Sequence, residues 1–316
     1  MGSMEESATS PFMCGVEEPM RFHYDWGSEE ALGSFIVQRM VECSGVSSTE
    51  IPEPLYGCID PDALEELFQP LADGTARASG KLTFMFAGHY ITASSDGTVE
   101  IESELGRLKR TGGNLLLTGD VPADLFEELS VQFLGAPSND RTHLFALYGR
   151  DVDVARKRLS RANANPAQAH ILTHEVAVRS ATQAQSNAFP DRPSASSVEG
   201  SLDDFQTAIQ DELLELQYGN RGFEPGELRF CLDSLQLLSN EEGSVAVERS
   251  LRKITETVEE LSGIGQYIFP GAFDSDSVQA VEPLFDVTIE LKLDPDGPKQ
   301  RWHLHETSHT TTWFPL

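Results

Sequence analysis

The sequence predicts an α/β protein built in two parts. The first is a small α+β module in which two helices pack on an antiparallel meander. The second is a mainly parallel sheet with helices on both faces and a C-terminal antiparallel hairpin. A period of two in the apolar residues between Lys81 and Ile101 indicates the module. Unbroken apolar runs that alternate with amphipathic helices from Asn114 onward indicate the parallel sheet.

The small module is expected at residues 25–106. Residues 1–24 mix Ser, Glu, Pro and Met without periodicity, so they are expected to form a flexible tail. Ser28 precedes apolar residues at helical spacing and is the expected N-cap of a first helix. Asp60 followed by Pro61 predicts the start of a second helix.

Three strands are expected after these helices. Their turns are predicted at Ala87-Gly88 and at Asp96-Gly97. His89 lies beside the first turn, where a lone histidine is expected to be a surface or packing residue. The segment from Gly106 to Gly113 is short, basic and rich in glycine, so we place the domain boundary there.

The second domain is expected at residues 107–316. Its expected strands are 114–118, 142–148, 169–178, 227–232, 266–269, 286–293 and 300–306, and its expected helices are 122–134, 151–162, 201–217, 244–261 and 275–284. Residues 180–200 have the Ser, Ala, Pro and Gln bias of a flexible loop.

The chain is strongly acidic. Its 51 acidic and 23 basic residues give a formal net charge of −28, and the basic residues are 17 Arg and 6 Lys. The charge is spread along the chain, whereas an acidic protein aimed at a basic partner usually concentrates it in one block. An acidic, lysine-poor surface keeps a protein soluble in molar salt, so the composition indicates a halophilic source.

The same composition indicates the compartment. No apolar run reaches the roughly 18 residues that span a bilayer, and the acidic N-terminus lacks the pattern of a signal peptide. The four cysteines have no metal-ligand spacing and are expected to be free thiols. A cytoplasmic protein is therefore expected.

The segment Gly112–Phe126, GGNLLLTGDVPADLF, has the strand, turn and helix order of a phosphate-binding loop. A working loop reads G-x-x-x-x-G-K-[ST]: backbone N–H groups and the lysine hold the phosphates, and the hydroxyl binds Mg²⁺. Here Gly119 is followed by no second glycine, lysine or hydroxyl. Pro122 removes a backbone donor, and Asp120 and Asp124 bring negative charge to the helix start. The turn is expected to exclude phosphate.

Two stretches resemble known families. SEEALGSFIVQRMVECSGVSSTEIPEPLYGCIDPDALEELF, followed by GKLTFMFAGHYITASSDGTVEI, resembles the halobacterial output domain, a module of haloarchaeal signalling proteins. That resemblance implies a role in signal output and no catalytic residues. The second half resembles the core of RecA-like and KaiC-like nucleoside triphosphatases, and an uncharacterised haloarchaeal family built on it. Its most specific match is LRFCLDSLQLL, a buried strand that ends in Asp-Ser-Leu.

The RecA-like resemblance implies where a nucleotide site would lie. In active relatives the aspartate at this strand end helps to position Mg²⁺, which is Asp233 here, although we expect it to be a strand-end or capping residue. A water-activating acid would follow the second strand, where Asp151 is the candidate and is expected to be an N-cap. We therefore expect a degenerate nucleotide site at Gly119, Asp120, Asp233 and Ser234, with no catalytic residue and no cofactor.

A second candidate site is a set of histidines. His303 and His305 share one face of a predicted strand, and a His-x-His pair on a strand can bind zinc or nickel. His309 follows, and His170 and His174 lie on another strand. Because no pattern brings a third ligand to them, no metal site is predicted, and His303 and His305 are kept as candidates.

These observations favour a non-enzymatic, cytoplasmic signalling protein of a halophilic archaeon that acts through protein–protein contacts. One alternative is a nucleotide-binding switch without the usual lysine. Another is a transcriptional regulator that contacts DNA through Arg107, Lys109 and Arg110, or through a partner. The negative field opposes direct contact with nucleic acid. A protein partner is expected, no membrane contact is expected, and a homo-oligomer is left open.

Overall fold

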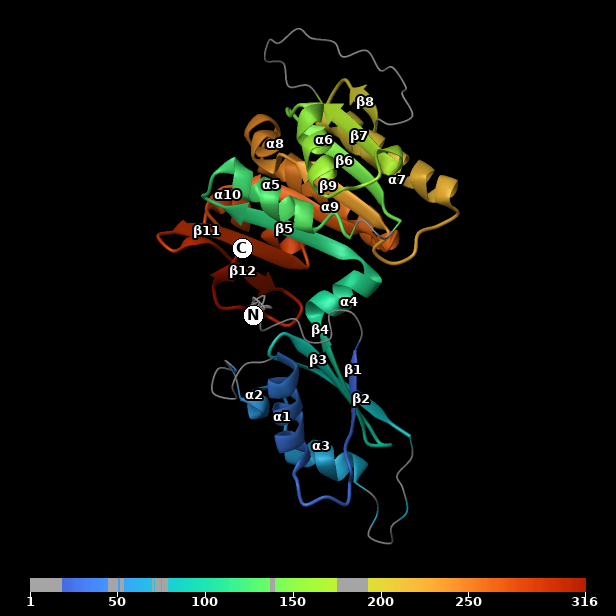
Figure 1. Ribbon diagram of the computed structural model, residues 1–316, viewed down its shortest axis with the longest axis vertical. Helices are drawn as coiled ribbons and strands as arrows, with labels where there is room; N and C mark the ends of the chain where they lie inside the picture. The colour runs from blue at the N-terminus through green and yellow to red at the C-terminus, as the bar shows by residue number, and fades with distance from the viewer. Residues whose placement is uncertain are drawn as a thin grey trace, which may run out of the picture. The chain divides into compact units, whose positions relative to one another are not determined.

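The computed structural model describes residues 19–44, 51, 54–69, 71, 75, 79–136, 140–174 and 193–316. The chain divides into two compact units (Figure 1). The first unit is Met1–Arg107 together with Glu306–Thr311, and the second is Leu108–His305 together with Thr312–Leu316. The first unit thus takes in a short segment near the C-terminus, which the boundary predicted from the sequence does not include.

The first unit contains one antiparallel sheet and the helices that pack on it. Its elements are β1 (Met20–His23), α1 (Leu32–Ser44), α2 (Leu55–Cys58), α3 (Pro61–Phe68), β2 (Lys81–Phe86), β3 (His89–Ser94), β4 (Thr98–Ser103) and the short β13 (His309–Thr310). The sheet has the order β1-β4-β3-β2. Ile36 and Met40 of α1 and Leu64 of α3 share one core with Ile91 and Ile101 of the sheet. The predicted small α+β module is confirmed.

The N-terminal end of this unit differs from the prediction. Residues 20–23, which the sequence assigns to the tail, form β1, and β1 pairs with β4 from Met20↔Ile101 to His23↔Thr98. Four residues are too few to show a strand period, and the β4 edge satisfies their backbone groups. Residues 1–18 of the predicted tail lie outside the described residues.

Of the two N-caps predicted for this unit, one is observed and the other is not. Asp60 caps α3 as expected, because its side chain accepts from the N–H groups of Asp62 and Ala63. Ser28 does not cap α1, which begins at Leu32. The N–H of Leu32 donates instead to Oε2 of Glu65 on α3, at 3.0 Å. A cap supplied by another helix leaves no local signal in the sequence.

Most of the predicted boundary segment, Gly106–Gly113, is helical. α4 covers Glu104–Thr111, and the division between the units falls within it. Glu104 is 4% exposed, and within the first unit its carboxylate accepts from the N–H of Glu306 at 3.3 Å and from the N–H and Oγ1 of Thr307 at 3.1 and 2.5 Å. His89 is a packing residue in the same unit, 1% exposed, whose Nδ1 donates to the carbonyl of Ala87.

The second unit is a twisted, mainly parallel sheet. Its strands are β5 (Gly113–Gly119), β6 (Thr142–Tyr148), β7 (Ala169–His174), β8 (Ser194–Val198), β9 (Leu228–Asp233), β10 (Ile264–Pro270), β11 (Val287–Asp294), β12 (Gly297–Leu304) and β14 (Phe314–Pro315). The order is β12-β11-β5-β10-β9-β6-β7-β8, with β14 paired to β12. The β11–β12 hairpin is antiparallel, and the strands from β11 to β8 are parallel to one another. The predicted sheet and C-terminal hairpin are confirmed.

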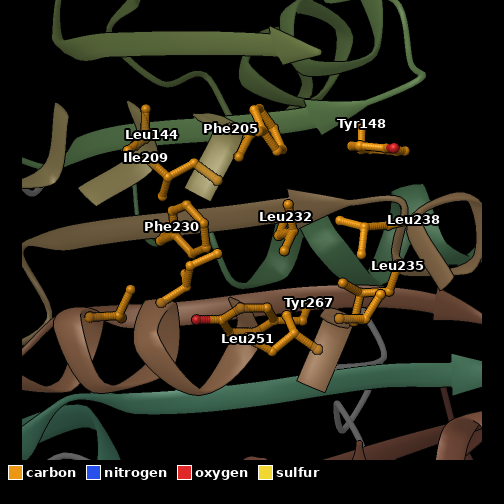
Figure 2. Close-up of a cluster of buried hydrophobic side chains, with 14 of the residues drawn as sticks. Leu144, Tyr148, Phe205, Ile209, Phe230, Leu232, Leu235, Leu238, Leu251 and Tyr267 are labelled. Atoms are coloured by element: carbon orange, nitrogen blue, oxygen red, sulfur yellow. The ribbon is translucent and has the colours of Figure 1, made fainter. Parts of the chain in front are cut away.

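Helices cover both faces of this sheet. They are α5 (Ala123–Gln132), α6 (Val152–Arg161), α7 (Leu202–Asn220), α8 (Leu235–Glu242), α9 (Ser244–Glu260), α10 (Asp276–Gln279) and the 3₁₀ turns η1 (Pro166–Gln168) and η2 (Glu282–Leu284). On one face α7, α8 and α9 bury Ile209, Leu238 and Leu251 against Phe230 and Tyr267 of the sheet (Figure 2). On the other face α5 and α6 pack on alternate residues of the same strands. Two buried faces explain the unbroken apolar runs of β5, β6 and β9.

Two elements of this unit escape the sequence pattern. β8 lies in the predicted loop 180–200 and pairs in parallel with β7. Its sequence, SASSV, has no apolar run because it lies at the end of the strand order. The rest of that loop up to residue 192, and the end of the strand predicted to reach Val178, lie outside the described residues. α8 follows β9 directly, at a place for which no helix is predicted from the sequence.

Candidate functional site

The predicted nucleotide site lies at the carboxyl edge of the large sheet. Gly119 ends β5 and Asp233 ends β9, with β10 between the two strands. In parallel α/β sheets ligands bind beyond the carboxyl ends of the strands. The structure therefore brings the residues predicted from the sequence to one edge, as the parallel arrangement requires.

The turn after β5 is held by backbone contacts. The N–H of Gly119 donates to the carbonyl of Gly271 at 2.8 Å, and the N–H of Gly271 donates back to Gly119 at 3.0 Å. The Oγ1 of Thr118 also donates to Gly271, at 2.9 Å. A Cβ at Gly119, where φ is +145°, would lie 2.4 Å from the carbonyl oxygen of Leu291. The glycine is needed for this close packing, and its amide does not face open space.

The start of α5 offers few donors to an anion. The helix begins after Pro122, which has no N–H and makes no side-chain cap. Asp120 and Asp124 are exposed on this turn. Glu127, one turn further on, is paired with Lys157 of α6 at 2.5 Å.

Asp233 is held by two arginines. Its side chain has no exposed surface, and Oδ2 accepts from Nη2 of Arg158 at 2.6 Å. Oδ1 accepts from Nε of Arg150 at 3.3 Å. Arg158 is 3% exposed and Arg150 is 34% exposed. Both oxygens of the carboxylate thus have guanidinium donors, and the buried pair has the geometry of a charge-assisted hydrogen bond.

The space around this ion cluster is small. A cavity of about 30 Å³ lies between Arg150, Arg158, Asp233 and the start of α5. This volume holds about one or two water molecules.

Local structure explains how the two arginines reach Asp233. Asp151 caps α6 by accepting from the N–H of Asp153 at 2.8 Å, so the residue predicted as an N-cap is one. Arg150 directly precedes this cap in the turn that follows β6, and Arg158 lies with Ala155 and Leu159 on the buried face of α6. Nη1 of Arg158 also contacts Sγ of Cys231 at 3.5 Å. Burial raises the pKa of that thiol to about 12, so it is neutral at physiological pH.

Neither Arg150 nor Arg158 is predicted as a site residue from the sequence. A signal for Arg158 was present, since it occupies an inward position of an amphipathic helix where an apolar residue is expected. Ser234 is 2% exposed and precedes α8 without making a side-chain cap.

The two candidate histidines, His303 and His305, pair with different carboxylates. Nε2 of His303 lies 3.1 Å from Oε2 of Glu290, and its ring stacks on Phe273 with centroids 4.1 Å apart. Nε2 of His305 lies 2.8 Å from Oε1 of Glu282. Among the described residues, no group of three or more His, Cys, Asp or Glu side chains could hold a metal ion.

Comparisons with known proteins agree with this architecture. Residues 112–291 match the model of a family of unknown function, DUF7504. The chain belongs to this family. Residues 28–103 match the model of halobacterial output domain 1, so the chain combines a region similar to that domain with the DUF7504 region.

The curated proteins and the solved structures add little more. No curated protein matches the chain. A KaiC-like protein from the hyperthermophilic archaeon Pyrococcus horikoshii OT3 is 14% identical, with a TM-score of 0.42, over 65% of this chain and 85% of that one. Of the helices in the described part of the chain, none is long and apolar enough to cross a membrane.

Proposed function

We propose that this DUF7504 protein is a non-enzymatic signalling protein that acts in the cytoplasm of a halophilic archaeon through protein–protein contacts. The match to an output domain supports the signalling role, and the acidic, lysine-poor composition supports the source and compartment. In this proposal the RecA-like domain is a scaffold and does not hydrolyse ATP.

The pairing of Asp233 carries the proposal. In an active site the carboxylate at this position has to face a hydrated Mg²⁺ and a triphosphate. Here both of its oxygens accept from guanidinium groups, and its side chain is fully buried. A metal ion would have to displace Arg158, which would leave a cation buried without a partner, at a cost of several kcal/mol.

The phosphates would also lack room and donors. The cavity beside Asp233 is about 30 Å³, and the amide of Gly119 donates to Gly271. Asp120 and Asp124 would face the triphosphate, and two like charges about 4 Å apart repel by about 1 to 4 kcal/mol at dielectric constants between water and a protein surface. The helix dipole of α5 offsets roughly 0.3 to 1 kcal/mol of that repulsion.

The surface of the output unit supports a role in contacts. A groove of about 550 Å³ lies between α1, α2 and α3, and its lining includes Val37, Val41, Leu55, Tyr56 and Pro61. Tyr56 is 65% exposed. Concave apolar surface of this size is typical of sites that bind other molecules.

Calorimetry with MgATP in molar KCl tests the proposal. The full chain is expected to bind no nucleotide at micromolar concentrations and to show no ATP turnover. Turnover that Asp233→Ala abolishes would overturn the proposal. Micromolar binding without turnover would instead support the nucleotide-binding switch.

Direct contact with DNA is tested separately. Arg107 of α4 is placed over the ring of Tyr90, 4.4 Å from its centroid, within the first unit. The net charge of −28 opposes approach to phosphate. We expect no mobility shift of DNA at low salt, and a shift that is sequence-selective and resists salt would favour the transcriptional alternative.

A further inference from the structure

A second cluster of arginines lies at the opposite, amino edge of the large sheet. Arg141 precedes β6, and Arg229 is the second residue of β9. The two strands are neighbours with His143 opposite Arg229 in the register. Arg229 lies near the start of β9 and Asp233 lies at its end. The cluster is therefore separate from the site and function described above.

The cationic groups of this cluster have almost no acceptors. Arg229 is 9% exposed, and its Nε has no hydrogen-bond partner in the described part of the chain. Arg141 donates from Nη1 to the carbonyl of Gly226 at 2.5 Å, and its Nε has no partner among the described residues. Neither arginine has a carboxylate within 4.0 Å among them. A buried arginine such as Arg229 is normally paired with a carboxylate, so this cluster is short of negative charge.

Two glycines lie close to these guanidinium groups. A Cβ at Gly135, where φ is +91°, would lie 3.2 Å from Nε of Arg141 and 3.6 Å from Nε of Arg229. A Cβ at Gly226, where φ is +69°, would lie 3.1 Å from the carbonyl oxygen of Lys109 and 3.6 Å from Nη2 of Arg229. Nε of both arginines therefore lies beside Gly135, which places the two guanidinium groups close together.

The pKa values of Arg229 and His143 also show that positive charge is disfavoured in this cluster. Burial, and then the charge of Arg141, lower the pKa of Arg229 to about 10, so its charged form is disfavoured there although it persists at neutral pH. Burial also lowers the pKa of His143 to about 4, and the charges of Arg229 and Arg141 contribute to that shift. Nε2 of this neutral histidine donates to the carbonyl of Leu134 at 3.1 Å. Glu227 is the acidic group that acts on Arg141, and its Oε2 accepts from the N–H of Glu224.

We propose that Arg141 and Arg229 form a binding site for one tetrahedral oxyanion of the phosphate class, either free inorganic phosphate or the phosphate group of a small monoester. Guanidinium groups match the geometry of phosphate oxygens and bind them through paired N–H donors. The bound anion supplies the negative charge that the cluster lacks.

The test measures binding and stability of the full chain at constant ionic strength. Inorganic phosphate, phenyl phosphate and chloride are titrated separately in molar KCl, with calorimetry and the thermal midpoint as readouts. Inorganic phosphate is expected to bind at one site and to raise the midpoint in a saturable way. Binding of phenyl phosphate as well would assign the site to a monoester, and its exclusion would assign the site to the free ion.

Single substitutions test whether phosphate binds at this cluster. Arg229→Met is expected to weaken phosphate binding about tenfold or more, because it removes a charged donor. Its stability without phosphate should equal or exceed that of the wild type, because a buried charge without a partner is removed. Arg141→Met is the second variant. Arg252→Met is the matched control, since Arg252 is 56% exposed on α9 and pairs with Glu248.

Three results would overturn the proposal. The first is the absence of any saturable effect of phosphate on the wild type. The second is equal stabilisation by chloride and phosphate at matched ionic strength. The third is unchanged phosphate binding in both Arg229→Met and Arg141→Met.

Discussion

The two edges of the large sheet carry arginine pairs of opposite character. At the carboxyl edge Arg150 and Arg158 share the buried carboxylate of Asp233, and the positive and negative groups satisfy each other. At the amino edge Arg141 and Arg229 have no carboxylate within 4.0 Å in the described part of the chain. At the carboxyl edge, where this fold is expected to bind phosphate, the ion pairs of Asp233 with Arg150 and Arg158 occupy the charged groups. At the edge where no site is expected, Nε of Arg141 and Nε of Arg229 have no hydrogen-bond partner among the described residues.

The largest effect is expected from Asp233→Ala. Removing the carboxylate leaves Arg158 buried without a partner, which should lower the free energy of unfolding by about 3 to 5 kcal/mol. Chemical denaturation of the full chain at fixed KCl measures it. Asp153→Ala is the control, because its partner Arg156 and Asp153 itself are exposed. A loss below about 1 kcal/mol would show that the carboxyl edge is not held by this pair.

A double variant tests whether the stability lost in Asp233→Ala comes from the unpaired Arg158. Asp233→Leu combined with Arg158→Met replaces the buried pair with apolar side chains, a change that is often neutral or stabilising by about 1 to 4 kcal/mol. The double variant should therefore recover most of the stability lost in Asp233→Ala. Failure to recover it would mean that Asp233 has a role beyond its pairing with Arg158.

The second effect concerns pH at the amino edge. The pKa of His143 is lowered from 6.5 to about 4 in the folded protein, mainly by burial, so the unfolded chain binds a proton between these values and the folded chain does not. This contribution to stability is complete above pH 6.5 and is lost as the pH falls towards 4. At pH 5 the wild type should have lost about 2 kcal/mol more than His143→Gln, relative to pH 7. Denaturation at both pH values measures the difference, and equal losses would contradict it.

A third and smaller effect is expected from Gly135→Ala. A side chain at positive φ costs about 1 to 2 kcal/mol, and the new Cβ would lie 3.2 Å from Nε of Arg141 and 3.6 Å from Nε of Arg229. Gly222→Ala is the matched control, because φ is +102° there and a Cβ would meet nothing within 4 Å. Both variants should lose stability, whereas phosphate binding should be lost in Gly135→Ala alone. Equal phosphate binding in the two variants would argue against the cluster.

The smallest effect is expected from Arg150→Met. Arg150 is 34% exposed, so water screens its ion pair, and Asp233 keeps its contact with Arg158. The loss of unfolding free energy should be at most about 1 kcal/mol. A loss as large as that of Asp233→Ala would assign the two arginines equal weight and would remove the distinction between the buried and the exposed partner.

The sequence predicts this fold well where local patterns repeat. The apolar runs of β5, β6 and β9 and the Asp60-Pro61 helix start all appear as expected. β1 and β8 are missed because a strand of four or five residues at a sheet edge shows no clear period. The segment Gly106–Gly113 contains the division between the units as predicted, but most of it belongs to the helix α4, in which Leu105 and Leu108 are buried.

The sequence likewise predicts part of the candidate site and leaves the rest to the tertiary structure. The sequence places Gly119 and Asp233 at strand ends and shows that the phosphate-binding motif is incomplete. It does not show that Arg150 and Arg158 turn towards Asp233, because these residues come from separate elements and meet through tertiary packing. The amino-edge cluster has no sequence signal at all, since Arg141 and Arg229 are 88 positions apart and are joined by strand register.

The sequence by itself determined the two-part α/β architecture, the acidic surface and the absence of a phosphate-binding motif after β5, because these depend on local periodicity and residue type. Only the tertiary structure decided which charges are paired. Whether a buried arginine has an acceptor depends on the groups that neighbouring strands and helices bring within hydrogen-bond distance. Asp233 meets two arginines at one edge of the sheet, and Arg229 meets no carboxylate in the described residues at the other.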